Sequence, residues 1–225
     1  MADVESQSRR RHDRDQFAES TETTVAAAVA EFEAAWNDPR TTSIELPPVD
    51  VNRTLAERYE VDPPTRMTGA QVWDMEVRKA WDPLTYIPYV VSEGESWATT
   101  DLPDGRRHLR SSIQRAWLSE ERGRVLEEVF TDVAARRVIF LGRPRLTGPQ
   151  GEALLADPYQ PLFHVEHGVG GTEDEPVNLW RIVVLTESVD PRYAAEFTKA
   201  GAAGGLPGFL EIYLARDLGV TLRRR

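Results

Sequence analysis

The chain has 225 residues, 40% of them hydrophobic and 28% charged, and its formal net charge is −10. This length suits one hydrophobic core with an extension. The lack of cysteine excludes disulfide scaffolds, thiolate zinc sites and cysteine nucleophiles, and the negative charge argues against a nucleic-acid partner. No apolar run approaches the roughly 20 residues of a membrane span, and the polar start lacks the apolar core of a signal peptide. We therefore expect no membrane span and a cytoplasmic location.

The N-terminal part is predicted to be an extension over residues 1–48. Its first 16 residues are polar and typical of a disordered tail. A short amphipathic helix is predicted between residues 20 and 39, and its apolar stripe would pack on the main domain or on a second subunit, which leaves a homodimer open. The segment 40–50 is interpreted as a linker. The stripe consists of Val25, Val29, Phe32 and Trp36.

The main domain, residues 49–225, is predicted to hold a run of strands framed by helices. A strand is predicted over 53–61 and a helix over 68–81, with Thr68 as N-cap. Alternation and turn residues predict strands over 84–91, 92–99, 107–118, 124–132, 136–142, 162–171 and 178–187. Helices are predicted over 190–200 and 206–220, separated by the glycine-rich segment 201–205. This order indicates an α+β fold in which a curved antiparallel sheet of six to seven strands wraps around a long C-terminal helix, with a cavity between them.

Three stretches of the main domain resemble segments of a known superfamily. They are 69-GAQVWDMEVRKAWDPLTYIPYV-90, 123-GRVLEEVFTDVAARRVIFLG-142, and the pair 163-FHVEHGVGG-171 and 178-NLWRIVVLTE-187. They resemble the entry helix, a central hairpin and the last two strands of the START-like helix-grip superfamily of SRPBCC-type proteins, which includes polyketide cyclases, lipid-transfer START domains and the birch-pollen allergen family. The resemblance spans residues 50–220, and it leaves out the N-terminal extension and the loop 143–161.

The resemblance implies that an apolar or aromatic small molecule is held in an internal, mostly apolar cavity. The polyketide-cyclase-like branch is the most similar, and it has no fixed motif that can be carried over residue by residue. We expect a cofactor-free cyclase, dehydratase or isomerase of secondary metabolism, such as antibiotic biosynthesis, that acts on an aromatic or polyketide-like molecule. The alternatives are a non-catalytic carrier of a lipid or isoprenoid, and a protein-interaction module that assembles through its N-terminal helix.

The candidate acid–base residues lie in 162-LFHVEHGVGG-171. Side chains alternate along a strand, so His164 and Glu166 share one face while Phe163 and His167 share the other. If Phe163 points inward, His167 lies at the cavity and can move a proton to or from an enol. If the faces are reversed, His164 and Glu166 form the inward dyad. A structural histidine near the strand end is the plain alternative, and no metal site is expected from four histidines and no cysteine.

The remaining candidates come from the neighbouring strands and helices. Arg181 lies among apolar residues and would bind an oxyanion of the ligand or pair with a glutamate at the surface. On the strand 107–118, the face carrying His108, Arg110, Ser112 and Gln114 is expected to meet solvent, so that Arg115 and Trp117 point inward. The predicted ligand-binding residues are Trp81, Tyr86, Tyr89, Arg115, Trp117, Phe163, Trp180, Phe209 and Tyr213.

Overall fold

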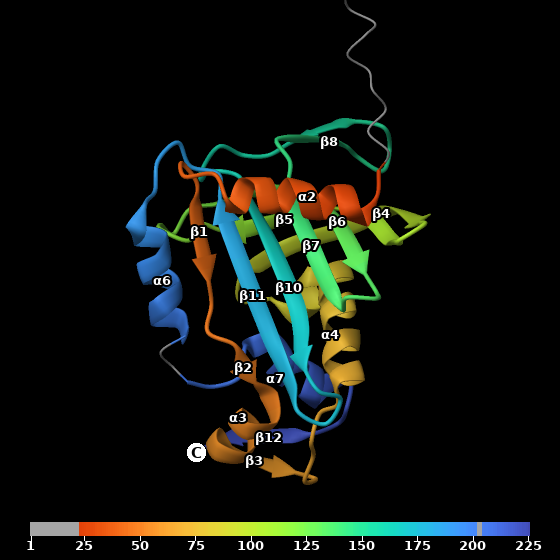
Figure 1. Cartoon of the computed structure of the whole chain (residues 1–225), viewed down its shortest axis with the longest axis vertical. Helices are drawn as coiled ribbons and strands as arrows, with labels where there is room; N and C mark the ends of the chain where they lie inside the picture. The colour runs from red at the N-terminus through yellow and green to blue at the C-terminus, as the bar shows by residue number, and fades with distance from the viewer. Residues whose placement is uncertain (1–22, 202–203) are drawn as a thin grey trace, which may run out of the picture.

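The structure, a computed structural model, describes residues 23–201 and 204–225. The predicted tail over residues 1–16 and part of the glycine-rich segment lie outside the described residues. The architecture is built on an 8-stranded antiparallel sheet (Figure 1). Its strands follow the order β1 (Thr42–Glu45), β11 (Pro176–Val184), β10 (Phe163–Gly171), β7 (Arg137–Gly142), β6 (Arg122–Asp132), β5 (Gly105–Arg115) and β4 (Val91–Leu102), and β2 (Val49–Asp50) also pairs with β11. The predicted α+β helix-grip fold is confirmed.

One face of the sheet, the outer face, is covered by helix α2 (Val25–Trp36). Figure 1 shows this helix lying across β11, β10 and β7. Its apolar stripe is buried against side chains of the sheet, and Asp104, in the turn between β4 and β5, accepts hydrogen bonds from the first two backbone N–H groups of the helix at 2.9 Å. The buried outer-face core comprises Val25, Ala28, Phe32, Phe130, Ile139, Leu141 and Val183.

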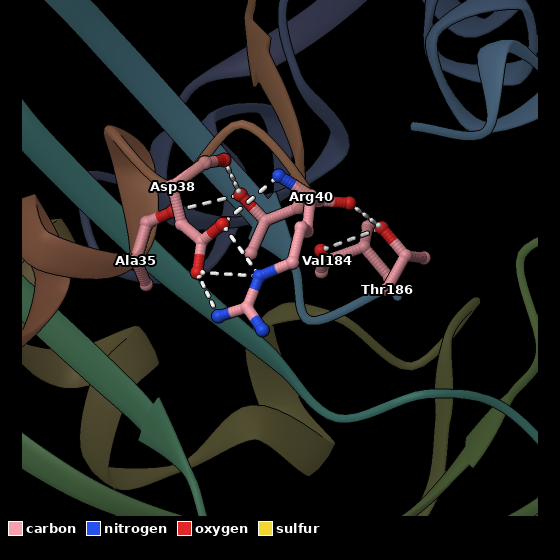
Figure 2. Close-up of polar contacts among 6 residues, drawn as sticks. Ala35, Asp38, Arg40, Val184 and Thr186 are labelled. Atoms are coloured by element: carbon pink, nitrogen blue, oxygen red, sulfur yellow. Dashed lines mark hydrogen bonds and ion pairs between the residues drawn. The ribbon is translucent and has the colours of Figure 1, made fainter. Parts of the chain in front are cut away.

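The turn that follows α2 is fixed to the end of β11 by polar contacts. The guanidinium of Arg40 pairs with Asp38 at 2.6 Å, and the hydroxyl of Thr186 donates to the carbonyl of Arg40 at 3.2 Å (Figure 2). The hydroxyls of Thr42 and Thr186 lie 2.9 Å apart. The segment 40–50, interpreted as a linker, therefore supplies β1 and β2 and joins the sheet. Its backbone pairs with β11, so the interpretation of this segment as a linker is wrong.

The opposite face, the inner face, is covered by α4 (Gly69–Trp81). A capping box starts this helix, since the Thr68 side chain accepts from the Gln71 backbone and the Gln71 side chain accepts from the Thr68 backbone. Val72 and Met75 face the core on consecutive turns. The short helix α5 (Pro83–Tyr86) follows at once.

The C-terminal helical region is divided into α6 (Pro191–Gly201) and α7 (Gly208–Arg216). Helix α6 lies beside β1 at one edge of the sheet (Figure 1). Helix α7 packs against α4 and α5, and its Phe209 and Leu210 are fully buried in the inner core. The two helices predicted over 190–200 and 206–220 are thus present as α6 and α7, and α7, with nine residues, closes the inner side where a long C-terminal helix was expected.

Two predicted strands are helical instead. Residues 53–61 were expected to be extended, but helix α3 (Val51–Arg58) precedes the short strand β3 (Tyr59–Asp62). Asp50 caps that helix by accepting from the Arg53 backbone, and the i, i+4 pair Val51 and Leu55 is buried. The predicted strand 84–91 is mostly α5 and a turn, because Asp82 caps the helix and Pro83 occupies its first position.

Two small sheets complete the fold. Strand β3 pairs with β12 (Thr221–Arg224) near the C-terminus. Strand β8 (Arg145–Thr147) pairs with β9 (Ala153–Leu155) within the loop 143–161.

Candidate functional site

Five polar and aromatic side chains meet between α4 and the inner face of the sheet, and we call them the inner cluster. Glu76 and Lys79 are one turn apart on α4, and His167 on β10 lies directly opposite Trp180 on β11. Asn178 lies two residues before Trp180 on the same strand, so its side chain points to the same face. Glu76, Lys79, His167 and Asn178 are all buried. The inner cluster consists of Glu76, Lys79, His167, Asn178 and Trp180.

A lysine ammonium organises the hydrogen bonds of the inner cluster. Lys79 Nζ lies 2.5 Å from Glu76 Oε2 and 2.5 Å from His167 Nδ1, and Asn178 donates to Glu76 Oε1 at 2.7 Å. The indole N–H of Trp180 also donates to His167 Nδ1. Glu76 Oε2 also lies 3.1 Å from Nδ1, so this one nitrogen is in contact with the ammonium, the carboxylate and the indole.

Burial controls the charges of the inner cluster. Burial lowers the pKa of Lys79 to about 8, although the Glu76 carboxylate acts in the opposite direction. Burial and the nearby Lys79 charge lower the pKa of His167 to about 4. Burial, the largest single influence, would raise the pKa of Glu76, but the Lys79 ammonium and the contacts with His167 together outweigh it and keep that pKa below its ordinary value. At neutral pH the cluster therefore holds an ionised Glu76, a neutral His167 and a Lys79 that can lose its proton.

Two aromatic rings enclose the lysine nitrogen. Lys79 Nζ lies 3.7 Å from the centroid of the Phe209 ring, which α7 contributes, and 5.5 Å from that of Trp180. The two rings are 5.3 Å apart and tilted by 34°. A cation over aromatic faces is stabilised by their quadrupoles, so this environment favours positive charge at the nitrogen while it excludes water.

A second buried ion pair lies on the same face, on β5 and β6. Arg110 donates to Glu127 Oε2 through Nη2 at 2.6 Å and through Nε at 2.8 Å, and a third donor reaches the carbonyl of Ala80 at 3.1 Å. His108 Nε2 lies 3.2 Å from the same carbonyl, and burial lowers the pKa of His108 to about 4. The side chains of Arg110 and His108 thus both contact a backbone carbonyl group in the last turn of α4.

This arrangement overturns the prediction for strand 107–118. The face with His108, Arg110, Ser112 and Gln114 is buried on the inner side, whereas Arg115 is exposed and pairs with Glu120. Arg110 is in register with Glu127 on β6, so two charges that each looked solvent-facing neutralise one another inside. Alternation alone could not reveal that pairing.

His164, Glu166 and Arg181 lie on the outer face, beneath α2. His164 Nδ1 accepts from the Gly142 backbone at 3.1 Å, and burial lowers the pKa of His164. Arg181 pairs with Glu166 at 2.8 Å and with Glu33 of α2 at 2.6 Å. The sheet separates these groups from His167, so the predicted joint action of His167 and Arg181 in one cavity is wrong, and so is the alternative with His164 and Glu166 pointing inward.

The predicted ligand-binding residues are spread over several environments. Trp81 and Tyr89 are 46% and 52% exposed. Tyr86 and Tyr213 donate to Asp217 and Asp74 and hold α7 against α5 and α4. Trp117 and Phe163 stack with centroids 4.4 Å apart near α6. Of the nine predicted ligand-binding residues, only Trp180 belongs to the inner cluster, and Phe209 packs against it.

The best-formed pockets among the described residues lie away from the inner cluster. The larger, about 430 Å³, is an open depression lined by Pro161 and residues 185–192. The second has about 10 Å³ of space, lies near Tyr159 and Phe163, and is about the size of one water molecule. Neither is the mostly apolar internal cavity that was predicted, and the polar side chains of the inner cluster are buried.

Among residues 23–201 and 204–225, no three histidine, aspartate or glutamate side chains are grouped so as to hold a metal ion. None of the helices in that part of the chain has the length and apolar character needed to cross a membrane.

Sequence reasoning found His167 but missed Glu76, Lys79 and Asn178. Lysine scarcity was a usable signal, because only two of the 27 basic residues are lysines and one of them is Lys79. Its position on the core-facing side of a helix, one turn after Glu76, was a second signal. The contact with β10 required the tertiary structure.

No protein-family model and no curated protein matches the chain. The fold is similar to that of the Zhui aromatase/cyclase from Streptomyces sp. R1128, with 14% identity, a TM-score of 0.48, and coverage of 80% of this chain and 99% of that chain. It is also similar to the di-domain ARO/CYC BexL from the BE-7585A biosynthetic pathway, with 14% identity, a TM-score of 0.48, and coverage of 94% of this chain and 59% of that chain.

A START superfamily protein from Mycobacterium smegmatis is similar at 12% identity and a TM-score of 0.44, with 79% of this chain and 93% of that chain covered. These solved structures are what the chain resembles in fold.

Proposed function

We propose that the protein is a cofactor-free enzyme that moves protons on an aromatic or polyketide-like small molecule at the inner cluster, as a cyclase, dehydratase or isomerase does. The observation that carries this proposal is the fully buried Glu76–Lys79 pair in contact with a neutral histidine. Buried charges are costly, and apolar side chains of similar volume often stabilise a fold equally well. Perturbed ionisable groups that are gathered in one place are typical of functional sites.

The three ionisable groups suit complementary roles in proton transfer. The Lys79 ammonium would stabilise an enolate oxygen, and its neutral form would accept a proton from a carbon next to a carbonyl. Glu76 keeps the ammonium charged enough to donate, and Asn178 fixes the carboxylate. His167 would accept a proton relayed by Lys79 through the 2.5 Å contact.

A ligand must displace a side chain to reach the inner cluster. The best candidate is Phe209, because its ring covers Lys79 Nζ and belongs to α7, a short helix. An aromatic ligand that takes the place of the Phe209 ring would stack on Trp180 and meet the ammonium. Such side-chain rearrangements on binding are common in proteins.

The first experiment identifies a ligand and then tests the cluster. Native mass spectrometry of the freshly purified protein, with extraction of anything retained, would give the ligand class. That class is then offered in D₂O, and deuterium uptake next to its carbonyl is followed by NMR. Lys79→Met and His167→Ala should abolish the uptake, whereas His164→Ala, a buried histidine on the outer face, should retain it. Equal uptake in all the variants would refute the proposal.

Neither pocket is the predicted internal cavity, and this favours one alternative, a protein-interaction module that catalyses no reaction. Such a module was predicted to bind its partner through the apolar stripe of the N-terminal helix. In the structure, Val25, Ala28 and Phe32 of this helix pack on the protein's own sheet. An interaction would therefore need another surface. A protein that stays empty when apolar and aromatic ligands are offered would favour this alternative.

A further inference from the structure

Lysine occupies a position where this chain could have used arginine. The chain has 27 basic residues, and only Lys79 and Lys199 are lysines. On the same face of the sheet, the buried Arg110–Glu127 pair shows that this interior accommodates an arginine ion pair. An arginine stays charged under all ordinary conditions, whereas a buried lysine can become a neutral amine. The lysine at position 79 therefore offers a nucleophilic nitrogen as well as a charge.

The contacts of this nitrogen are those of an amine that reacts with a carbonyl group. Nζ has a carboxylate and an imidazole nitrogen at 2.5 Å each, so a proton can leave it and return. Two aromatic rings shield it from water, which would otherwise hydrolyse an imine. Desolvation and nearby proton acceptors are the conditions under which lysines form Schiff bases.

We propose that Lys79 captures an aldehyde or ketone covalently as an imine, so that the molecule acted on at the inner cluster is a carbonyl compound. This inference rests on the proposed function and assigns its substrate class. It adds a covalent step that simple proton transfer does not require.

The step balances without any oxidant or reductant. The neutral nitrogen of Lys79 adds to the carbonyl carbon, and the carbonyl oxygen takes up the proton that the nitrogen gives up through His167, forming a carbinolamine. The carbon–oxygen bond then breaks, the proton that the ammonium gave up before the addition goes to the departing oxygen, and water leaves as the carbon–nitrogen double bond forms. Overall, an ammonium and a carbonyl give a protonated imine and water. The net charge is unchanged, so Glu76 faces a cation before and after the step.

The protonated imine would also draw electrons from the adjacent carbon. Loss of a proton from that carbon gives an enamine, which is the nucleophile for ring closure or the intermediate of a dehydration. Capture at Lys79 therefore serves the same reaction classes as the proposed proton transfer.

The test uses borohydride to make the imine permanent. Benzaldehyde and sodium borohydride are added to the full chain at pH 8, and adducts are located by peptide mass spectrometry. Lys199, with a side chain 78% exposed, is the internal control. The variant Lys199→Arg leaves Lys79 as the only lysine. An increase in the intact mass of this variant then reports an adduct on Lys79 or on the N-terminal amine, and the mass of the N-terminal peptide distinguishes the two.

The expected result is an adduct on Lys79. A pKa of about 8 gives on the order of a hundredfold more neutral amine at neutral pH than an ordinary lysine has, so we expect at least about tenfold more adduct on Lys79 than on Lys199. Lys79→Arg, which keeps the charge, should lose that adduct. Adduct confined to Lys199 and the N-terminus would overturn covalent capture. The deuterium-uptake assay separates the two proposals, because uptake without any Lys79 adduct refutes the imine and leaves proton transfer standing.

Discussion

Removing the charge of Lys79 should destabilise the protein strongly, because the buried carboxyl group of Glu76 would lose its counter-ion. Lys79→Met removes the charged hydrogen bonds from Nζ to Glu76 and to His167. Each such bond is worth about 1.5–3 kcal/mol, and breaking a buried pair by removing one partner costs about 3–5 kcal/mol. Glu76 keeps only the amide of Asn178 and its contact with His167. We therefore expect a loss of about 4 kcal/mol in the free energy of unfolding.

Urea denaturation followed by tryptophan fluorescence measures this loss. With an m-value of about 2–3 kcal/mol per molar, the midpoint should fall by about 1.5 M. The control is the double variant Glu76→Gln with Lys79→Met, in which a neutral amide still accepts from Asn178 and no charge is stranded. The double variant should be more stable than Lys79→Met alone. A single variant within about 1 kcal/mol of the parent, or a double variant whose loss equals the sum of the two single losses, would refute the reasoning.

Other predictions concern pH, helix capping and the outer face. The pKa of His167 is about 4 in the native state and about 6.5 in an unfolded chain. Between these pH values the unfolded chain binds a proton that the native state does not. The free energy of unfolding should therefore fall by up to about 3 kcal/mol as pH is lowered from about 6.5 to about 4. His108 adds to the same slope, and His167→Gln should flatten it in urea titrations at several pH values. Asp104→Ala removes both acceptors at the start of α2 and should cost about 1 kcal/mol of thermal stability; an unchanged melting curve would contradict the capping role. Arg181→Met removes the bond from Arg181 to Glu166 on the outer face and should lower the free energy of unfolding by about 1–3 kcal/mol. Deuterium uptake should be unchanged, and a folded variant that has lost uptake would show that Arg181 takes part in the reaction.

The central strands could be predicted from the sequence because apolar residues alternate along most of their length. Strands β7 and β10 lie within the predicted ranges, as does α4 with its Thr68 cap, whereas β6 and β11 each start two residues before the predicted range. The strand predicted over 53–61 was wrong because Asp50 caps a helix there, although the alternation of apolar and polar residues in this segment is typical of a strand.

The site was harder to predict than the fold because it depends on which charges meet across elements. The strand pattern placed His167 on the same face as Phe163, and the structure agrees. Nothing in one strand could show that Glu76 and Lys79 of α4 lie against it, or that Arg181 pairs with two glutamates under α2. Buried ion pairs look like surface residues in a sequence until both partners are placed.

Whether Lys79 loses its proton near neutral pH is the most direct test of this account. Lysine labelled with ¹³C at the carbon next to Nζ gives two NMR signals, one from Lys79 and one from Lys199, and Lys79→Arg assigns them. We predict that the Lys79 signal titrates with a midpoint near pH 8. A midpoint above about 10, the ordinary range of a lysine, would show a fixed structural ion pair and contradict both the proton-transfer site and the carbonyl capture.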